Sequence, residues 1–437
     1  MRKAHFGLQA YRSYLPSAAD YFEAAPSHWL VVPGMLAMTE NHRDNKGMKE
    51  SQVLSLSYGQ IVVKAEEKLA GLVPESFETY QLTVPGDIII RCTDLQNDQS
   101  SLRSGLVKDR GIITSAYICL SAKQGFDFRY LHYLLHLLDI SKAIYKLGSG
   151  LRQNLSFDDF KRLPVLRPPY SEQLLIADYL DQKSTQIDQA IQIKERQIEL
   201  LKERKQILIQ QSVTRGLDPR ASMRDSGIEW IGEIPAHWQT RRFKYLFSQS
   251  HLPVRPDDGV VTSYRDGQVT LRSNRRLAGY TEAILEGGYQ GVRKGQLVLN
   301  SMDAFEGAIG VSESDGKCTP EYVVCDSRSG DYLPEYFAYL LREMALARFI
   351  QVICNAVRQR AVRIRFNNLA SRFMAVPPIE EQRAIVALIK TETERQDVAV
   401  ALLEQQITKL KEYKSTLINS AVTGKIKAPG VVEPQLC

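Results

Sequence analysis

The sequence predicts an α+β fold in which two mixed globular domains are each followed by one long helix. Residues 168–176 read Pro-Pro-x-x-Glu-Gln-x-x-Ile, and residues 377–385 repeat this pattern at an offset of 209. Each copy leads into about forty residues with apolar side chains at helical spacing. A period of this length is far above that of a solenoid repeat, so a whole domain-plus-helix module is present twice.

The same offset of 209 extends to both ends of the repeated module. Val213-Thr214 matches Val422-Thr423, and Pro26-x-His28-Trp29 matches Pro235-x-His237-Trp238. The helical parts match best, while the mixed domains have diverged. We therefore interpret the mixed domains as two recognition surfaces that are free to differ, and the helices as parts with a common constraint.

Composition sets broad limits. The 437 residues suffice for two or more domains, and 44% hydrophobic and 24% charged residues are typical of a globular protein. The net charge of +6 suits a polyanionic partner without requiring one. The six cysteines include no Cys-x-x-Cys pair and read as reduced thiols of a cytoplasmic protein. We expect no signal peptide and no membrane span, since no run of 18 apolar residues occurs.

The first mixed domain is predicted over residues 1–167. Gln60–Lys64 alternates apolar and polar residues, and Asp87–Arg91 is a buried-strand run after the Pro85-Gly86 turn. One helix is predicted from Phe128 to Lys146.

The central long helix is predicted over residues 168–217. Residues 172–214 contain neither Pro nor Gly, and apolar or long side chains follow a 4-3 spacing typical of a helix that packs against another long helix. This seam consists of Ile187, Ile191, Lys194, Ile198, Leu201, Lys205 and Leu208. Forty residues of helix span roughly 60 Å. Gly216 and Pro219 predict its end.

A linker and the second mixed domain are predicted over residues 218–376. Residues 294–300 echo 85–91 at the offset of 209, whereas Tyr336 echoes Tyr130 at 206. The second long helix is predicted over 377–424, with a seam through Val400, Leu403, Ile407, Leu410, Lys414 and Leu417. Residues 425–437 contain two prolines and are predicted to be a flexible tail.

Catalytic signatures are missing from the sequence. It contains no Gly-rich dinucleotide loop, no Walker A motif, no Asn-Pro-Pro-aromatic or Asp-Pro-Pro-aromatic tetrapeptide and no clear nuclease carboxylate cluster. His132 and His136 stand four apart on the predicted helix, but a pair without a third ligand favours two helix-face histidines over a metal site. Asp257-Asp258 precedes Gly259 and favours a turn over an acid pair.

Basic clusters are the candidate binding residues. Arginine side chains suit guanine edges and phosphates, and Gln pairs with adenine, so these residue types favour DNA contact over a solvated loop edge. The densest cluster has four arginines in eight residues with no acidic residue among them. The candidates are Arg358, Gln359, Arg360, Arg363 and Arg365, the thinner counterpart Arg152-Gln153 at an offset of 206, and the stretch Arg272, Arg275 and Arg276.

The repeated Pro-Pro-x-x-Glu-Gln-x-x-Ile motif, each time before a long helix, resembles the specificity subunit of type I restriction-modification enzymes. Residues 226–238, Ser-Gly-Ile-Glu-Trp-Ile-Gly-Glu-Ile-Pro-x-His-Trp, are also typical of this family. The likeness covers nearly the whole chain. The first module keeps Pro26-x-His28-Trp29 but lacks the preceding Ser-Gly-Ile-Glu-Trp run.

The resemblance implies two target recognition domains whose long helices pair as an antiparallel coiled coil and act as a ruler. It implies a bipartite double-stranded DNA target with a fixed spacer. Methylation and ATP-dependent cleavage would belong to partners, namely two modification subunits and the restriction/translocase subunits. The chain itself would hold no cofactor, and S-adenosylmethionine, ATP and Mg would be bound by those partners.

Two other classes of function stay open at this point. One is an enzyme, such as a standalone DNA methyltransferase or nuclease, against which the missing motifs argue. The other is a scaffold whose helices join protein partners and whose mixed domains bind no DNA. The polar outer faces of the helices, for example at Lys202, Glu203 and Arg204, fit either plain solvent or another subunit.

Overall fold

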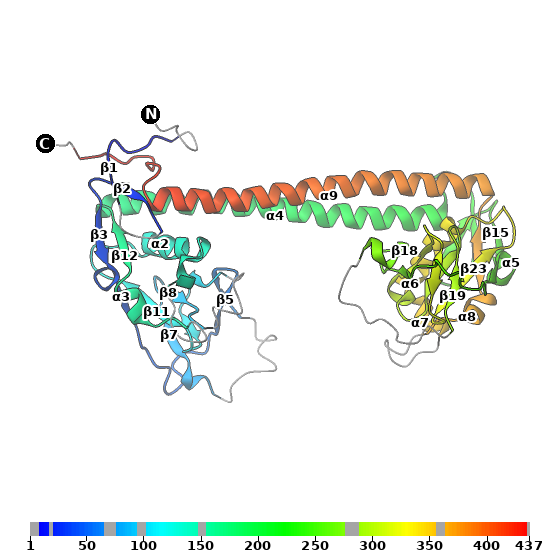
Figure 1. Cartoon of the computed structure of the whole chain (residues 1–437), viewed down its shortest axis with the longest axis horizontal. Coiled ribbons are helices and arrows are strands. Elements are labelled where there is room, and N and C mark those ends of the chain that lie inside the picture. Colours follow the sequence, from blue (N-terminus) through cyan, green and yellow to red (C-terminus); the bar gives the residue numbers. More distant parts are fainter. Residues whose placement is uncertain are drawn as a thin grey trace. The chain divides into compact units, whose positions relative to one another are not determined.

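The computed structural model describes residues 8–16, 21–64, 76–93, 102–146, 154–275, 288–354 and 363–434. The chain divides into two compact units, which we call unit 1 (residues 1–194 and 404–437) and unit 2 (residues 195–403). Each unit contains one mixed domain and a part of both long helices (Figure 1). The sequence prediction treats each long helix as a separate segment of the chain. In the structure, each compact unit instead includes a part of both long helices.

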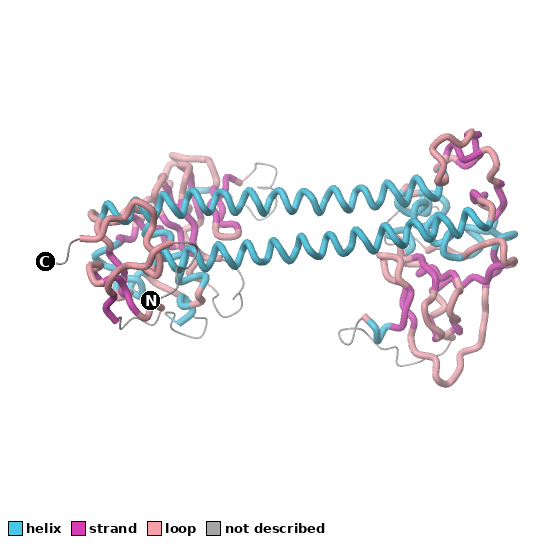
Figure 2. The backbone as a smooth tube through the Cα atoms, turned by 90° about the horizontal axis from the view of Figure 1, so that it is seen from above, coloured by secondary structure: helices cyan, strands magenta, loops and turns pink. Residues whose placement is uncertain are grey.

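The long helices are α4 (Tyr170–Arg215) and α9 (Ile379–Val422), which are continuous over 46 and 44 residues (Figures 1 and 2). In unit 1, Asp188 pairs with Lys414 at 2.7 Å and Lys194 donates to Gln406 at 2.6 Å. In unit 2, Lys205 pairs with Asp397 at 2.8 Å. The residue number of the contacting side chain on α9 falls as that on α4 rises, so the two helices run in opposite directions. The predicted antiparallel pairing is confirmed.

The helix seam has the predicted residues. Ile187, Ile191 and Ile198 of α4 and Ile407 and Leu417 of α9 are buried. The two seam lysines, Lys205 and Lys414, are each neutralised by an aspartate of the other helix, and these aspartates also match each other at the repeat offset. Partly exposed ion pairs contribute at most about 1 kcal/mol, so we interpret them as fixing the register rather than the stability.

The described residues of unit 1 form a four-stranded antiparallel sheet in the order β4-β11-β8-β9, together with four two-stranded sheets. Its strands are β1 (Tyr14–Pro16), β2 (Ala24–Pro26), β3 (Leu30–Pro33), β4 (Met38–Glu40), β5 (Leu54–Ser57), β6 (Gln60–Val63), β7 (Gln81–Thr83), β8 (Ile88–Ile90), β9 (Ser104–Leu106), β10 (Gly111–Ile113), β11 (Ile118–Ala122) and β12 (Pro164–Arg167). Its shorter helices are α1 (Gly34–Ala37), α2 (Phe128–Ile140) and α3 (Phe157–Lys161).

Two predicted elements of unit 1 show how local chemistry sets their bounds. The Pro85-Gly86 turn, with Gly86 at φ +95°, leads into the fully buried strand β8 as predicted. Asp127 caps α2 by accepting the backbone N–H groups of Arg129 and Tyr130. The helix predicted over Phe128–Lys146 is interrupted, because Lys142 has φ +60°, and only a 3-10 turn over Ala143–Lys146 follows.

Unit 2 repeats the arrangement with a four-stranded sheet in the order β16-β23-β20-β21. Its strands are β13 (Met223–Ile228), β14 (Gly232–Pro235), β15 (Gln239–Arg242), β16 (Phe247–Gln249), β17 (Val261–Ser263), β18 (Val269–Leu271), β19 (Gln290–Val292), β20 (Leu297–Asn300), β21 (Ile309–Val311), β22 (Gly316–Cys318), β23 (Tyr322–Ser327) and β24 (Phe373–Val376). Its shorter helices are α5 (Phe243–Leu246), α6 (Pro334–Leu346), α7 (Phe349–Ile353) and α8 (Phe366–Ala370).

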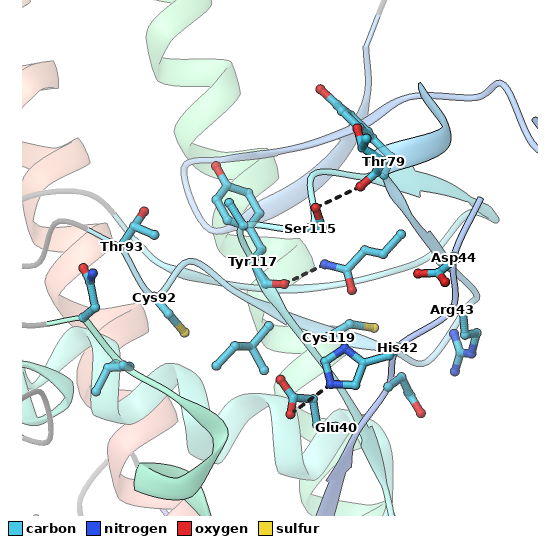
Figure 3. Close-up of a pocket in the computed structure, with 17 residues that line it drawn as sticks. Glu40, His42, Arg43, Asp44, Thr79, Cys92, Thr93, Ser115, Tyr117 and Cys119 are labelled. Carbon is cyan, nitrogen blue, oxygen red and sulfur yellow. Dashed lines mark hydrogen bonds and ion pairs between the residues drawn. The ribbon is translucent and has the colours of Figure 1, made fainter. Parts of the chain in front are cut away.

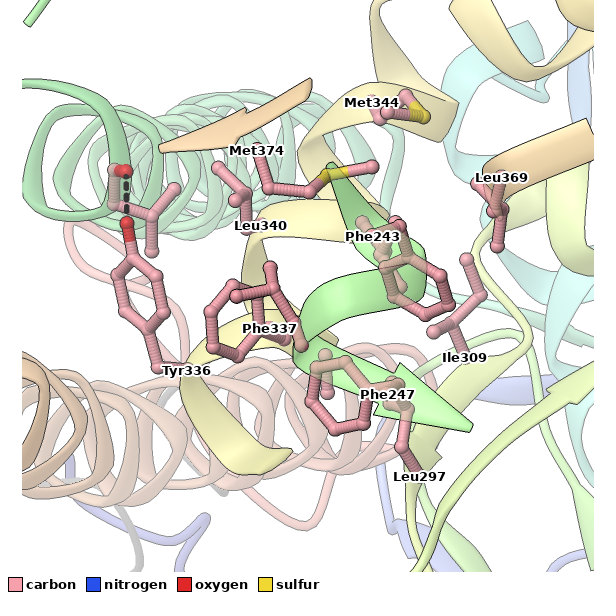
Figure 4. Close-up of a cluster of buried hydrophobic side chains, with 14 of the residues drawn as sticks. Phe243, Phe247, Leu297, Ile309, Tyr336, Phe337, Leu340, Met344, Leu369 and Met374 are labelled. Atoms are coloured by element: carbon pink, nitrogen blue, oxygen red, sulfur yellow. Dashed lines mark hydrogen bonds between the residues drawn. The ribbon is translucent and has the colours of Figure 1, made fainter. Parts of the chain in front are cut away.

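The core of unit 2 is apolar and aromatic. Phe243, Phe247 and Phe337 converge with Leu340 and Met374 between the sheet and α6 (Figure 4). The same cluster includes residues from the end of α4 and from the start of α9, such as Val213 and Ile385. The mixed domain of unit 2 is therefore packed on both long helices.

The N-terminal hairpin extends the repeat, and the C-terminal tail differs from the prediction. The hairpin of β1 and β2 pairs Tyr14 with Pro26, and β13 with β14 pairs Met223 with Pro235, so the offset of 209 extends upstream of the Pro-x-His-Trp motif despite the missing Ser-Gly-Ile-Glu-Trp run. Residues 425–434, within the predicted flexible tail, bury Ile426 and Ala428, and Lys427 donates its backbone N–H to Gln9 at 2.8 Å. Ile426 and Ala428, which precede the first of the two prolines, provide this packing, whereas residues 435–437 lie outside the described part.

Candidate nucleic-acid interface

A glutamate at the start of each long helix holds the Pro-x-His-Trp motif of its own unit. Glu172 accepts the indole N–H of Trp29 at 3.0 Å, contacts His28 Nε2 at 3.0 Å and accepts the hydroxyl of Tyr11. In unit 2, Glu381 accepts Trp238 at 3.0 Å and contacts His237 at 2.8 Å. The repeated Glu is therefore a hydrogen-bond acceptor with a structural role, because it joins the start of the long helix to the Pro-x-His-Trp segment of the same unit.

The neighbouring glutamine fixes the shorter helix of the mixed domain. Gln173 accepts the backbone N–H of Asp127, the cap of α2, at 2.9 Å, and donates to the carbonyls of Gly125 and Pro168 at 3.0 and 2.9 Å. Gln382 repeats all three contacts at 2.9 Å, with Leu333, Asp331 and Pro377. Both glutamines are fully buried, so the Glu-Gln dipeptide orients the mixed domain on its helix.

A buried tyrosine completes this common scaffold. Tyr130 of α2 donates to the carbonyl of Leu166 or Val422, and Tyr336 of α6 donates to that of Ala375 or Val213. Leu166 and Ala375 match each other at the repeat offset of 209, as do Val213 and Val422. The two tyrosines match at 206, which confirms the shifted match predicted for these helices.

The structure describes four of the ten predicted binding residues. Arg363, Arg365, Arg272 and Arg275 are described, and all four lie in unit 2. Arg152, Gln153, Arg358, Gln359, Arg360 and Arg276 lie outside the described residues.

Arg363 and Arg365 share one carboxylate that the local sequence does not reveal. Glu321, more than forty residues upstream, lies 3.8 Å from Arg363 Nε and 3.4 Å from Arg365 Nη2. Both arginines remain about half exposed, at 41% and 52% of their side chains. The absence of acidic residues within the cluster therefore does not mean that its charges are uncompensated.

Arg272 and Arg275 follow β18 and contact residues of β17 and of the β17–β18 turn. Arg275 pairs with Asp266 at 2.7 Å and covers the ring of Tyr264 at 4.1 Å, while Arg272 Nε lies 3.4 Å from the Thr262 hydroxyl. Burial raises the pKa of Tyr322 to about 12, and the nearby positive charge of Arg272 opposes this rise. Tyr322 directly follows Glu321, the carboxylate that Arg363 and Arg365 share.

In unit 1, the residue after Arg152-Gln153 borders a polar cavity of about 270 Å³. Asn154 lines it together with Thr93, Tyr117 and His42, and Figure 3 shows His42 and Tyr117 on two sides of the hollow. The backbone N–H of Leu155 donates to Cys92 and that of Ile364 donates to Ser301. Leu155 and Ile364 lie 209 residues apart, as do Cys92 and Ser301. The repeat offset is therefore 209 again directly after the two Arg-Gln segments, which match at 206.

The other two candidate groups have structural roles. Burial lowers the pKa of His132 to about 3, and burial with the charge of Lys414 lowers that of His136 to about 4. Within the described part of the chain, no group of three His, Cys, Asp or Glu side chains could hold a metal ion. Asp258 accepts the backbone N–H of Arg255 at 2.7 Å and the side chain of Arg293, which confirms the predicted turn.

Two curated proteins are similar to this chain in sequence. The type I restriction enzyme MjaVIII specificity subunit of Methanocaldococcus jannaschii is 23% identical over 333 residues, covering 73% of this chain and 75% of the relative. The putative MjaX specificity subunit of the same organism is 22% identical over 315 residues, covering 68% of each. Over about two thirds of its length, this chain is similar in sequence to type I restriction enzyme specificity subunits.

Two solved structures from type I restriction-modification systems share the fold. A structure from work on complex assembly and conformational transition of a type I restriction-modification system matches with a TM-score of 0.65 and 14% identity, over 92% of this chain and 99% of that one. The HsdS subunit of Thermoanaerobacter tengcongensis matches with a TM-score of 0.51 and 15% identity, over 94% and 100%. The predicted resemblance and fold class are thus confirmed.

No family model matches the chain. Among the described helices, none is both long and apolar enough to cross a membrane. The contact of the Glu-Gln dipeptide with the Pro-x-His-Trp motif was not predicted from the sequence. The signal was present, because both motifs recur at the same offset of 209.

Proposed function

We propose that this chain is the DNA sequence-specificity subunit of a type I restriction-modification complex. One observation carries the proposal: the contacts that orient each mixed domain on the helices recur in both units, while the domains themselves differ. Glu172 and Glu381, Gln173 and Gln382 repeat their partners, yet the acid-paired arginines around β23 have no described equivalent in unit 1. A common scaffold with different surfaces suits two different half-sites.

The proposed target is a bipartite, asymmetric site in double-stranded DNA. Each mixed domain would be a target recognition domain for one half-site, and α4 and α9 would set the spacer. The continuous length of α4, roughly 70 Å at 1.5 Å per residue, supports a ruler of fixed length. Two linked readers gain affinity together only if both engage at once, so a stiff spacer makes half-site spacing part of the recognition.

The proposed partners are two modification subunits and the restriction/translocase subunits, which would supply methylation and cleavage with S-adenosylmethionine, ATP and Mg. The chain itself would be non-catalytic. Exposed apolar side chains on the helices of unit 2 are candidate contacts for these partners. These are Leu200, Ile207, Val398 and Leu402, which are 44–61% exposed.

Methylome sequencing tests the proposal. Cells that carry this chain with its modification partners should show methylation of one motif made of two different half-sites with a constant spacer. A palindromic motif would contradict the predicted asymmetry, and no motif at all would contradict the function. As a control, the purified chain alone, incubated with a labelled methyl donor and DNA, should transfer no label.

A further inference from the structure

Unit 2 has a second basic surface, separate from the predicted clusters, on the sheet of β15 and β24 and on α5. We call it the β15 face and define it by Arg241, Arg242, Lys244, Arg328 and Arg372. All five side chains are exposed. Among the residues that the structure describes, no carboxylate forms an ion pair with any of them within 4.0 Å.

The contrast with other arginines of unit 2 is informative. Arg255, Arg265 and Arg275 are also exposed, yet each pairs with an aspartate at 2.7–3.1 Å. Five neighbouring cations without a carboxylate repel one another, and such an arrangement is costly unless an anion binds it.

The backbone segments that carry Arg242, Lys244, Arg328 and Arg372 lie next to one another. Arg242 and Phe373 are cross-strand partners, and the backbone N–H of Phe243 donates to the carbonyl of Arg372 at 2.8 Å. Arg328 Nε donates to the carbonyl of Lys244 at 2.8 Å. Phe243, which lies between Arg242 and Lys244 in the sequence, points into the core (Figure 4), while Arg242 and Lys244 are exposed.

The charged groups are also held in place before any ligand binds. Arg241 donates to the hydroxyl of Tyr332 at 3.0 Å, while the Arg242 guanidinium covers the ring of Phe373 at 5.3 Å. The Lys244 ammonium lies 5.1 Å from the ring centre of Tyr245. Arg241 and Arg242 border an open hollow of about 370 Å³. Preoriented cations lose less side-chain entropy on binding.

Unit 1 lacks these charges at the matched positions. At the offset of 209, Arg241, Arg242, Lys244 and Tyr245 correspond to Val32, Pro33, Met35 and Leu36. Met35 and Leu36 are 48% and 55% exposed. One cation remains, since Lys123 donates to the carbonyl of Met35 at 2.7 Å as Arg328 does to that of Lys244. The charges of Arg241, Arg242 and Lys244 are therefore specific to unit 2 and are not required by the shared scaffold.

We propose that the β15 face binds the phosphodiester backbone of duplex DNA without reading its sequence. This inference rests on the proposed DNA-binding function. Phosphate contacts from Arg and Lys position a protein on the duplex and carry no base information. Since the aromatic rings are each covered by a cation, they serve here to orient the charges, which favours phosphates over stacking on unpaired bases.

The test uses the full-length chain and a labelled duplex of random sequence. The substitution R242Q/K244Q/R372Q removes three unpaired charges, and the control R255Q/R265Q/R383Q removes three charges that already pair with carboxylates. Each lost phosphate contact lowers the slope of log K against log salt by about 0.9. We expect the slope of the first variant to fall by about 2–3 between roughly 50 and 200 mM salt, and that of the control to change little.

Further arms make the outcome decisive. The variant R242K/R372K keeps the charges and should retain the wild-type slope. The preference for the cognate site over random duplex should stay unchanged in all variants. If the triple variant and the control behave alike, if only single-stranded DNA binding is lost, or if only partner-subunit binding is lost, the inference is wrong. If the wild-type chain itself shows no preference for any duplex, the proposed function fails instead.

Discussion

Trp238 donates its indole N–H to Glu381 over 3.0 Å, and at the matched position of the first module Trp29 makes the same contact with Glu172 over the same distance. The two contacts differ in their surroundings. The Glu172 side chain is 5% exposed and also accepts Tyr11, whereas that of Glu381 is 22% exposed. One repeated interaction should therefore contribute unequally to the stability of the two units.

We predict that E172A destabilises unit 1 by roughly 2–4 kcal/mol and that E381A destabilises unit 2 by about half as much, because a buried donor left without an acceptor costs about 1–3 kcal/mol and Glu172 serves more buried donors. Urea unfolding followed by tryptophan fluorescence checks this, because Trp29 reports on unit 1 and Trp230 and Trp238 on unit 2. E380Q, at an exposed position, is the control. Equal losses for both variants would contradict the prediction.

The sequence predicted the repeat, the helices and their seam because these depend on short-range spacing. Heptad positions such as Ile187 and Ile407 face the partner helix in any such pair, and the structure buries both. Contacts between distant segments were not predictable in the same way. Glu321 lies more than forty residues from Arg363, so no local pattern shows that it compensates the arginine cluster.

Other misses have equally specific causes. The break in the helix predicted to Lys146 depends on the left-handed backbone at Lys142, which propensity does not reveal for a lysine. The packing of residues 425–434 depends on acceptors near the N-terminus, such as the carbonyl of Gln9. The β15 face was visible in part as Arg241-Arg242-x-Lys244, but Arg328 and Arg372 join it only through the tertiary fold.

We predict that unit 1 loses stability as the pH falls below about 6.5. His132 and His136 have folded-state pKa values near 3 and 4, below the ordinary value of 6.5. The unfolded chain therefore binds more protons in this window, and each histidine costs up to about 1.4 kcal/mol per pH unit. H132L should halve this slope, because it removes one of the two histidines. His132 Nε2 is buried without a partner, so its loss breaks no hydrogen bond of that nitrogen.

The pH series is measured by urea unfolding from pH 7 to pH 5 with Trp29 fluorescence. H42Q provides the control, because the His42 side chain is 77% exposed and its loss should leave the slope unchanged. An unaltered slope in H132L would show that another group of unit 1 governs the acid response.

Arg363 and Arg365 are expected to contact DNA in competition with Glu321. Replacing a base-reading arginine should cost about 1–3 kcal/mol and relax preference at one position of a single half-site. Conversely, E321Q should raise affinity for random duplex, because two guanidinium groups lose their carboxylate. Binding by fluorescence anisotropy, with R383A as the ion-paired control, checks both directions. Unchanged affinity in R363A/R365A would remove this pair from the interface and leave Arg272 and Arg275 as candidates.

The spacer of the DNA target should shorten when both long helices lose one heptad. Lys194 contacts Gln406 and Lys205 contacts Asp397, so residues 194–200 of α4 face approximately 401–407 of α9, and both segments must be deleted together. Seven residues remove roughly 10 Å of helix, or about three base pairs, while the seam register is kept. Methylome sequencing of the double deletion gives the new spacer.

A length-preserving variant separates the ruler from the identity of its residues. Residues 403–409 carry the same seam pattern as 194–200 at the offset of 209, so copying them into α4 changes the sequence but not the length. This variant should keep the original spacer, whereas the double deletion should shorten it and leave both half-sites unaltered. An unchanged spacer in a folded deletion variant would mean that the helices do not set the distance between the two recognition domains.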